Sequence, residues 1–141
     1  MAKTRILSEQ LFLNFLKNVP QAGQGTYYIL LLTGAPADSG TDFTKELTQG
    51  GSVGAGYARL PITAAQWTVL QASPTTAKNN ALLAYPSATG NWTTVTHFAI
   101  ATLAGIATGN MIIFGALTAS VTVLNTDTAQ WAISALTLTE T

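Results

Sequence analysis

The amino-acid sequence predicts a mainly β protein: a single-domain β-sandwich or jelly-roll-like barrel with one short N-terminal helix. About seven or eight short segments rich in Thr, Val, Ile and Phe recur at intervals of roughly 8–12 residues, a spacing typical of sandwiches and barrels. Clusters of turn-forming residues separate these segments. The length of 141 residues suits one domain with a hydrophobic core, and neither an internal repeat nor a change of composition marks a domain boundary.

A predicted hairpin over residues 92–118 is the centre of this domain. Its two strands cover residues 94–102 and 110–118, where β-branched and aromatic residues dominate. Residues 103–109, here named the tip, connect the strands, and Gly105 and Gly109 are the flexible points of this loop. The composition of the hairpin indicates a structural element, because nothing in it is typical of a catalytic motif.

One helix is predicted, within an N-terminal arm of residues 1–20. Ser8 is a suitable N-cap, and Pro20 prevents the helix from continuing. An apolar stripe at spacings of three and four comprises Leu11, Phe12, Phe15 and Leu16. A helix of about ten residues is not stable alone. We therefore expect it either to cover the core of the domain or to reach a neighbouring subunit as an assembly arm.

The next two segments differ sharply. Residues 27–33 are apolar throughout, which indicates a strand buried on both faces or lying at a subunit interface. Residues 34–56 form a long Gly-rich loop, and loops of this length usually bind something or move. A helical turn over residues 42–47 is expected inside it, capped by Thr41 and presenting Phe43. The glycines lack the Gly-Lys-Ser/Thr ending of a phosphate-binding loop.

The remaining strands are short and alternate polar with apolar residues. We predict them at residues 57–63, 66–71, 80–85, 120–125 and 129–138. Pro61 makes the first of them an edge strand, because proline cannot donate a hydrogen bond to a ladder. Residues 73–80 are expected to be a polar link, and residues 126–128 a turn.

Charge is the unusual property of this chain. Asp, Glu, Lys and Arg make up 9% of the residues, against roughly 25% in a typical soluble domain. The few basic residues are scattered, so we expect no nucleic-acid partner. An uncharged polar surface is easy to desolvate, which favours an obligate oligomer or a lattice component over the alternative, an uncharged monomer. No apolar run reaches the ~20 residues of a membrane helix, so no membrane partner is expected, and we expect synthesis in the cytoplasm.

Candidate catalytic residues are few, and we expect no enzyme, no cofactor and no metal site. His97 is the single histidine and is interpreted as a structural residue. Asp38 and Asp42 can meet as a carboxylate pair in the long loop, but they lack the alternating ligands of a calcium loop. The chain lacks cysteine and any Gly-x-Ser-x-Gly nucleophile motif.

Three tryptophans allow two interpretations. Trp67, Trp92 and Trp131 can form a surface on which a sugar stacks. The commoner role of such residues is to anchor a core or an interface.

Three motifs resemble a group of small virion proteins of tailed bacteriophages. The first is a Gly-Tyr-x-Arg strand that contains Tyr57 and Arg59, and the second is a Trp-x-x-Val-Thr-His hairpin that starts at Trp92. The third is a Gly-Ala-Leu-Thr strand followed by an alternating C-terminal pair. The resemblance covers the second half of the chain well and the first third poorly. Where family-like chains often carry Asp-Ala-Ala-x-Gly-Gly, this chain has the longer and more apolar tip.

The resemblance implies a capsid decoration (cement) protein, a homotrimer that bridges major capsid protein subunits on the outer surface of the virion. The alternative that it leaves open is a tail-fibre or tail-tip module that binds a host surface glycan. In either case Trp92, Tyr57, Arg59 and His97 are expected to belong to the scaffold. A monomer that exposed Leu103 and Ile106 on a loop would be prone to aggregate, so the apolar tip indicates a contact. The candidate assembly contacts are Leu11, Phe12, Phe15, Leu16, Phe43, Leu103 and Ile106.

Overall fold

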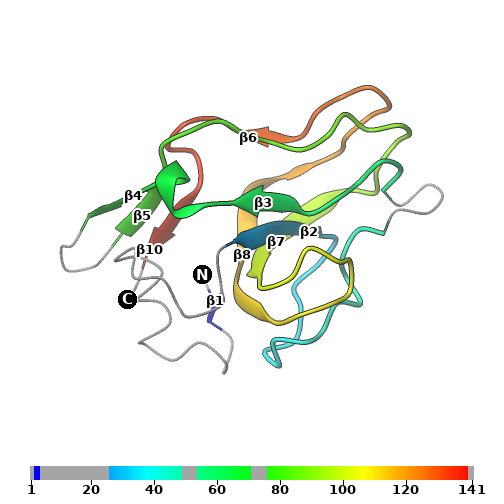
Figure 1. Ribbon diagram of the computed structural model, residues 1–141. Helices are drawn as coiled ribbons and strands as arrows, with labels where there is room; N and C mark the ends of the chain where they lie inside the picture. Colours follow the sequence, from blue (N-terminus) through cyan, green and yellow to red (C-terminus); the bar gives the residue numbers. More distant parts are fainter. Residues whose placement is uncertain (1, 4–25, 49–53, 71–75, 140–141) are drawn as a thin grey trace.

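The computed structural model describes residues 2–3, 26–48, 54–70 and 76–139, and within them the protein consists almost entirely of antiparallel β-strands (Figure 1). A main sheet packs against two smaller ones, which confirms the predicted sandwich-like, mainly β class. The expected N-terminal helix, with Leu11, Phe12, Phe15 and Leu16, lies outside the described residues, so it stays a prediction.

The main sheet has the strand order β1-β8-β7-β2-β3. Its strands are β1 (Ala2–Lys3), β2 (Tyr27–Leu32), β3 (Leu60–Ile62), β7 (Val95–Ala101) and β8 (Met111–Val121). The predicted hairpin is confirmed as the β7–β8 pair. The short strand β3 lies at an edge and carries Pro61, as the sequence predicts.

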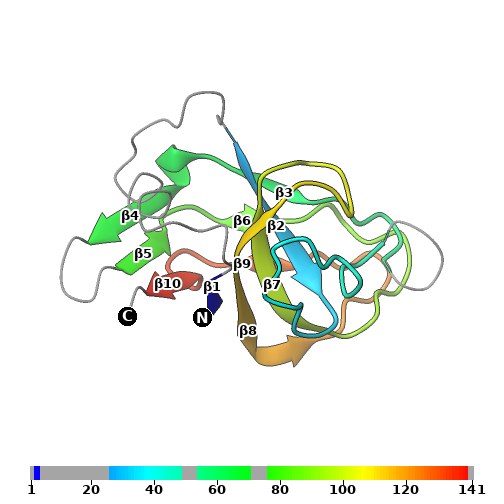
Figure 2. The ribbon, with the colours of Figure 1, turned by 90° about the horizontal axis from the view of Figure 1, so that it is seen from below.

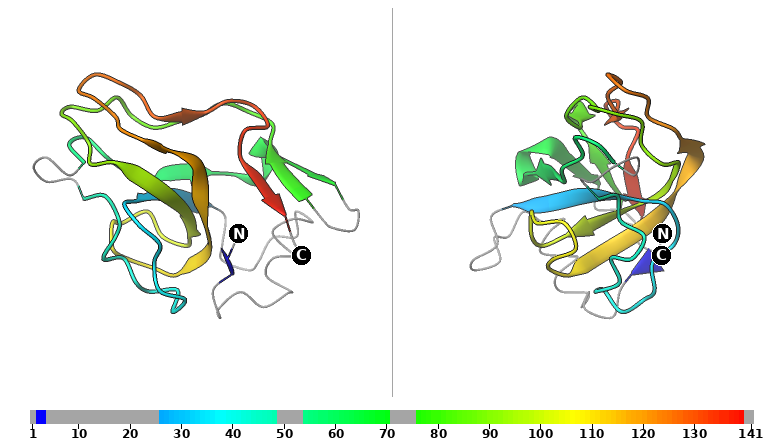
Figure 3. Two further views of the ribbon diagram at one scale, coloured as in Figure 1. Left: turned by 180° about the vertical axis from the view of Figure 1, so that it is seen from behind. Right: turned by 90° about the vertical axis from the view of Figure 1, so that its right-hand side faces the viewer.

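Two smaller sheets lie against the main one (Figures 1 and 3). The three-stranded sheet has the order β10-β5-β4, with β4 (Trp67–Leu70), β5 (Thr76–Asn79) and β10 (Thr137–Thr139). A pair of two-residue strands, β6 (Leu83–Ala84) and β9 (Gln130–Trp131), forms the third sheet. A single 3-10 turn, Ala64–Gln66, leads from the main sheet into β4.

The central strand β2 is buried on both faces, which explains its unbroken apolar sequence. Ile29 belongs to the core between the main sheet and the three-stranded sheet. Leu30 and Leu32 point to the opposite face, where they meet Phe114 and Phe43. Because side chains alternate along a strand, every position of a doubly covered strand must be apolar. The prediction that residues 27–33 are buried on both faces is therefore confirmed.

The expected polar link at residues 73–80 is wrong, because β5 lies there as the middle strand of the three-stranded sheet. Asn79 makes this polar strand possible. Its amide Nδ2 donates to the carbonyl oxygens of Ala81 and Ala132, both at 2.8 Å, and its Oδ1 accepts from the Leu136 amide at 2.9 Å. The side chain is fully buried and its hydrogen bonds are made, so it does not destabilise the core.

Asn79 also explains why the predicted strand at residues 129–138 divides into β9 and β10. The Ser134 amide donates to the backbone carbonyl of Asn79, and Ser134 itself has a positive φ of 63°. The Ala135 amide donates to the Ala132 carbonyl, which closes a turn between the two short strands. Alternation along the sequence cannot reveal a reversal that depends on a residue in a distant strand.

Three further predictions need correction. A separate strand at residues 120–125 is wrong, because β8 continues to Val121 through an irregular stretch. The helical turn at residues 42–47 is absent, since Glu46 bridges Leu32 in an antiparallel pairing. The strands expected at residues 57–63 and 80–85 form only over β3 and β6.

Adjacent leucines provide a matched test of this core. Leu83 is 1% exposed and Leu82 is 54% exposed. We expect Leu83→Ala to lower the free energy of unfolding by about 2–5 kcal/mol and Leu82→Ala to change it by less than about 0.5 kcal/mol. Urea denaturation followed by fluorescence measures both values, and similar losses in the two variants would contradict the placement of β6.

Candidate functional site

A buried ion pair between Glu46 and Arg59 joins distant parts of the chain. The Nε of Arg59 donates to Oε1 of Glu46 and its Nη2 donates to Oε2, both at 2.7 Å. Both side chains are completely shielded from solvent. A bidentate arginine–carboxylate pair is among the strongest contacts that side chains make, but a partner left alone at such depth is costly.

The same two side chains hold the tip in place. The Nη1 of Arg59 donates to the carbonyl oxygens of Leu103 at 2.7 Å and Thr108 at 2.9 Å. Oε2 of Glu46 accepts from the Ala107 amide at 2.9 Å. The ion pair therefore binds the tip at its first residue and again near its end, and this loop is a preformed feature of the surface.

Backbone conformation at the tip agrees with this restraint. Ala107 has a φ of 57°, which is uncommon for a residue with a Cβ atom, and its amide is the group that Glu46 binds. Gly109 has a φ of 79°, and a Cβ atom there would lie 2.8 Å from the Thr102 hydroxyl. The tip thus requires glycine at its end.

The two large apolar residues of the tip, Leu103 and Ile106, differ in their exposure to solvent. Leu103 is 52% exposed. Ile106 is half-buried and packs against the aromatic core cluster, so it is less exposed than Leu103, and its role as a contact stays a prediction. Buried side chains, Arg59 and Glu46, bind the backbone of this loop, and Leu103 is its exposed large apolar side chain.

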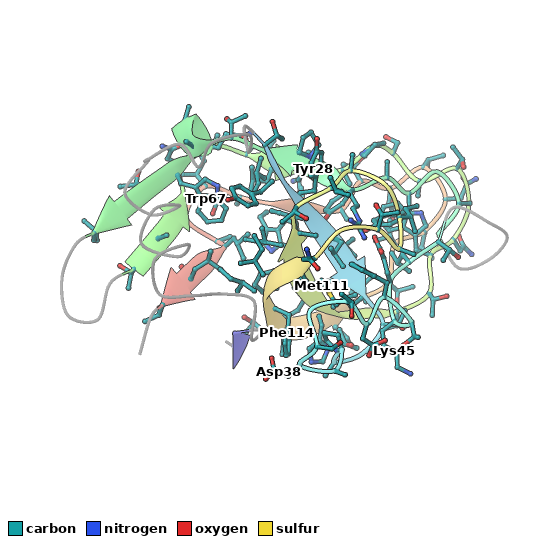
Figure 4. All side chains as sticks on the ribbon, turned by 60° about the horizontal axis from the view of Figure 1, so that its bottom comes forward. Tyr28, Asp38, Lys45, Trp67, Met111 and Phe114 are labelled. Carbon is teal, nitrogen blue, oxygen red and sulfur yellow. The ribbon has the colours of Figure 1, made fainter. Side chains whose placement is uncertain are left out.

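The first part of the long loop, residues 34–48, is held by hydrogen bonds and packing within the loop and by Arg59. Asp42 accepts hydrogen bonds from the Thr44 hydroxyl and from the amides of Thr44 and Ala37, which together lower the pKa of the Asp42 carboxyl. Phe43 is half-buried beneath the Arg59 guanidinium, whose Cζ lies 5.0 Å from the centroid of the Phe43 ring. Figure 4 shows Asp38 and Lys45 of this loop along the lower edge of the view, whereas Trp67 lies at the upper left.

The two carboxylates that the sequence singles out differ in their surroundings. Asp42 acts as a loop stabiliser through its hydrogen bonds, while Asp38 is exposed. Among the residues that the structure describes, no group of three His, Asp or Glu side chains is placed to hold a metal ion. Within that same part of the chain, no helix has the length and apolar character to cross a membrane.

Tyr57 and Trp92, from the first two motifs, meet in one aromatic cluster with Tyr85. Tyr57 stacks on Tyr85 with ring centroids 6.0 Å apart, and Trp92 meets both rings edge-on. The Nε1 of Trp92 donates to the Ala55 carbonyl at 2.8 Å. Trp67 and Trp92 are buried, so the core interpretation holds for them and a sugar platform of three tryptophans is wrong. His97 is half-buried and its Nδ1 is 2.8 Å from the Thr96 hydroxyl.

An apolar groove of about 250 Å³ lies where β8 ends, and sequence reasoning missed it. Val95 pairs with Val121 and His97 pairs with Ala116, so residues 117–120 of β8 lie opposite Thr96 alone. This bulge forms one wall of the groove. This recess is here named the groove. Its lining residues are Leu31, Val95, Leu117, Thr118, Ala119, Val121, Val123, Ala129, Gln130, Trp131 and Ala135.

Comparison with known proteins identifies the family. Residues 2–139 match the family model described as Podophage GP4 fiber I protein gp80. The chain belongs to this family. It is therefore a structural protein of a bacteriophage virion, which confirms the virion location that the sequence resemblance implies. A comparison with curated proteins gave no match.

Sequence reasoning found some residues of this phage protein's site and missed others. Tyr57 and Arg59 were recognised as scaffold from the Gly-Tyr-x-Arg motif. Glu46 was missed, although a buried arginine needs an acid and few acids are present in the chain. The candidate contacts Phe43, Leu103 and Ile106 all lie around this ion pair, and their role in assembly stays a prediction.

Removing one partner of the ion pair tests its role. Glu46→Gln leaves the Arg59 charge buried and unpaired, and we expect a loss of about 3–5 kcal/mol in the free energy of unfolding. The matched control is Lys45→Gln at the neighbouring exposed position, with an expected change below about 0.5 kcal/mol. Hydrogen exchange should show faster exchange of the Ala107 amide in the Glu46→Gln variant only. An unchanged tip would contradict the role assigned to Glu46.

The buried tyrosines predict a loss of stability at alkaline pH. Burial raises the pKa of Tyr57 and Tyr85 well above their ordinary value of 10.0, and the nearby Glu46 charge raises both further. The unfolded chain therefore releases these protons first. The contribution of these tyrosines to the free energy of unfolding should be complete below pH 10. Above pH 10 the free energy of unfolding should fall by up to about 1.4 kcal/mol per pH unit for each phenol.

A Tyr85→Phe variant separates this effect from other alkaline effects. The variant lacks the Tyr85 phenol, so only Tyr57 contributes. Above pH 10 its free energy of unfolding should therefore fall less steeply, by up to about 1.4 kcal/mol per pH unit. Urea denaturation across the alkaline range measures the slope. Equal slopes in the two proteins would show that Tyr85 does not titrate on unfolding.

Proposed function

We propose that the protein is a fibre subunit of the phage virion that acts by assembly and not by catalysis. The observation that carries this proposal is the match of residues 2–139 to the fibre-protein family model. Leu103, on the tip that the buried ion pair holds, is one of several large apolar side chains that assembly would bury, and the others include the similarly exposed Leu70, Leu124 and Ile133. The family description as a fibre protein supports this assignment.

The charge of the chain supports permanent contacts. Six basic and six acidic residues give no net charge. Two of them, Glu46 and Arg59, form the buried pair and so contribute no charge to the surface. Contacts between uncharged surfaces need no desolvation of ions. We propose assembly with further copies of the chain, including the homotrimer that the motif resemblance implies, and no cofactor or nucleic acid.

Capsid decoration is the second candidate. The same uncharged surface and ordered apolar tip suit a contact with the major capsid protein, where the protein would bridge neighbouring subunits and stabilise the shell. Host glycan binding has less support, because Trp67 and Trp92 are buried in the core. Trp131 is the one tryptophan that lines the groove.

Location in the virion distinguishes the two candidates. We expect immunogold labelling of intact virions, with antibody raised against the purified chain, to mark the fibres and leave the capsid surface unlabelled. Antibody pre-adsorbed with the chain is the control. Labelling distributed over the capsid would overturn the fibre assignment in favour of decoration.

A further inference from the structure

We draw no further inference here: the strongest candidate, the apolar groove where β8 ends (Figure 2), carries nothing because no feature of the described residues shows what covers it.

Discussion

The buried pair of Glu46 and Arg59 is the interaction on which the arrangement of this protein depends. It connects the long loop after β2, the segment before β3 and the loop between β7 and β8, which are 13 to 61 residues apart in sequence. Replacing two buried charges by apolar residues often leaves a protein equally stable, so stability alone does not explain such a pair. What an apolar pair cannot do is bind three backbone groups of one loop at once.

The aromatic cluster beside this pair explains why distant motifs occur together in one sequence pattern. Tyr57 donates its hydroxyl hydrogen towards Glu46 and accepts from the Leu31 amide. Trp92 touches the ring of Tyr57 and bonds the Ala55 carbonyl. The first two motifs therefore pack on each other through Tyr57 and Trp92. The pattern describes a scaffold, and the surfaces that bind partners are built onto it.

The parts of the fold that the sequence predicts are those fixed by local chemistry. β2 is apolar throughout, the β7–β8 hairpin is rich in β-branched residues, and Pro61 has to lie at an edge. The parts that it does not predict depend on distant partners. The polar strand β5 exists because Asn79 finds three partners, two of them more than fifty residues away, and the reversal at Ser134 depends on the same residue. The groove arises from a register shift that no periodicity reveals.

The bulge of β8 has a consequence for how the protein diversifies. Residues 117–120 have no counterparts in β7 beyond Thr96, so they are surplus to the pairing that defines the hairpin. A change in the number of residues there leaves the register on both sides intact. Composition is less free than length, because Leu117 packs against both core clusters and belongs to the Gly-Ala-Leu-Thr motif. An insertion among the exposed Thr118, Ala119 and Ser120 would therefore alter the surface without shifting the strands.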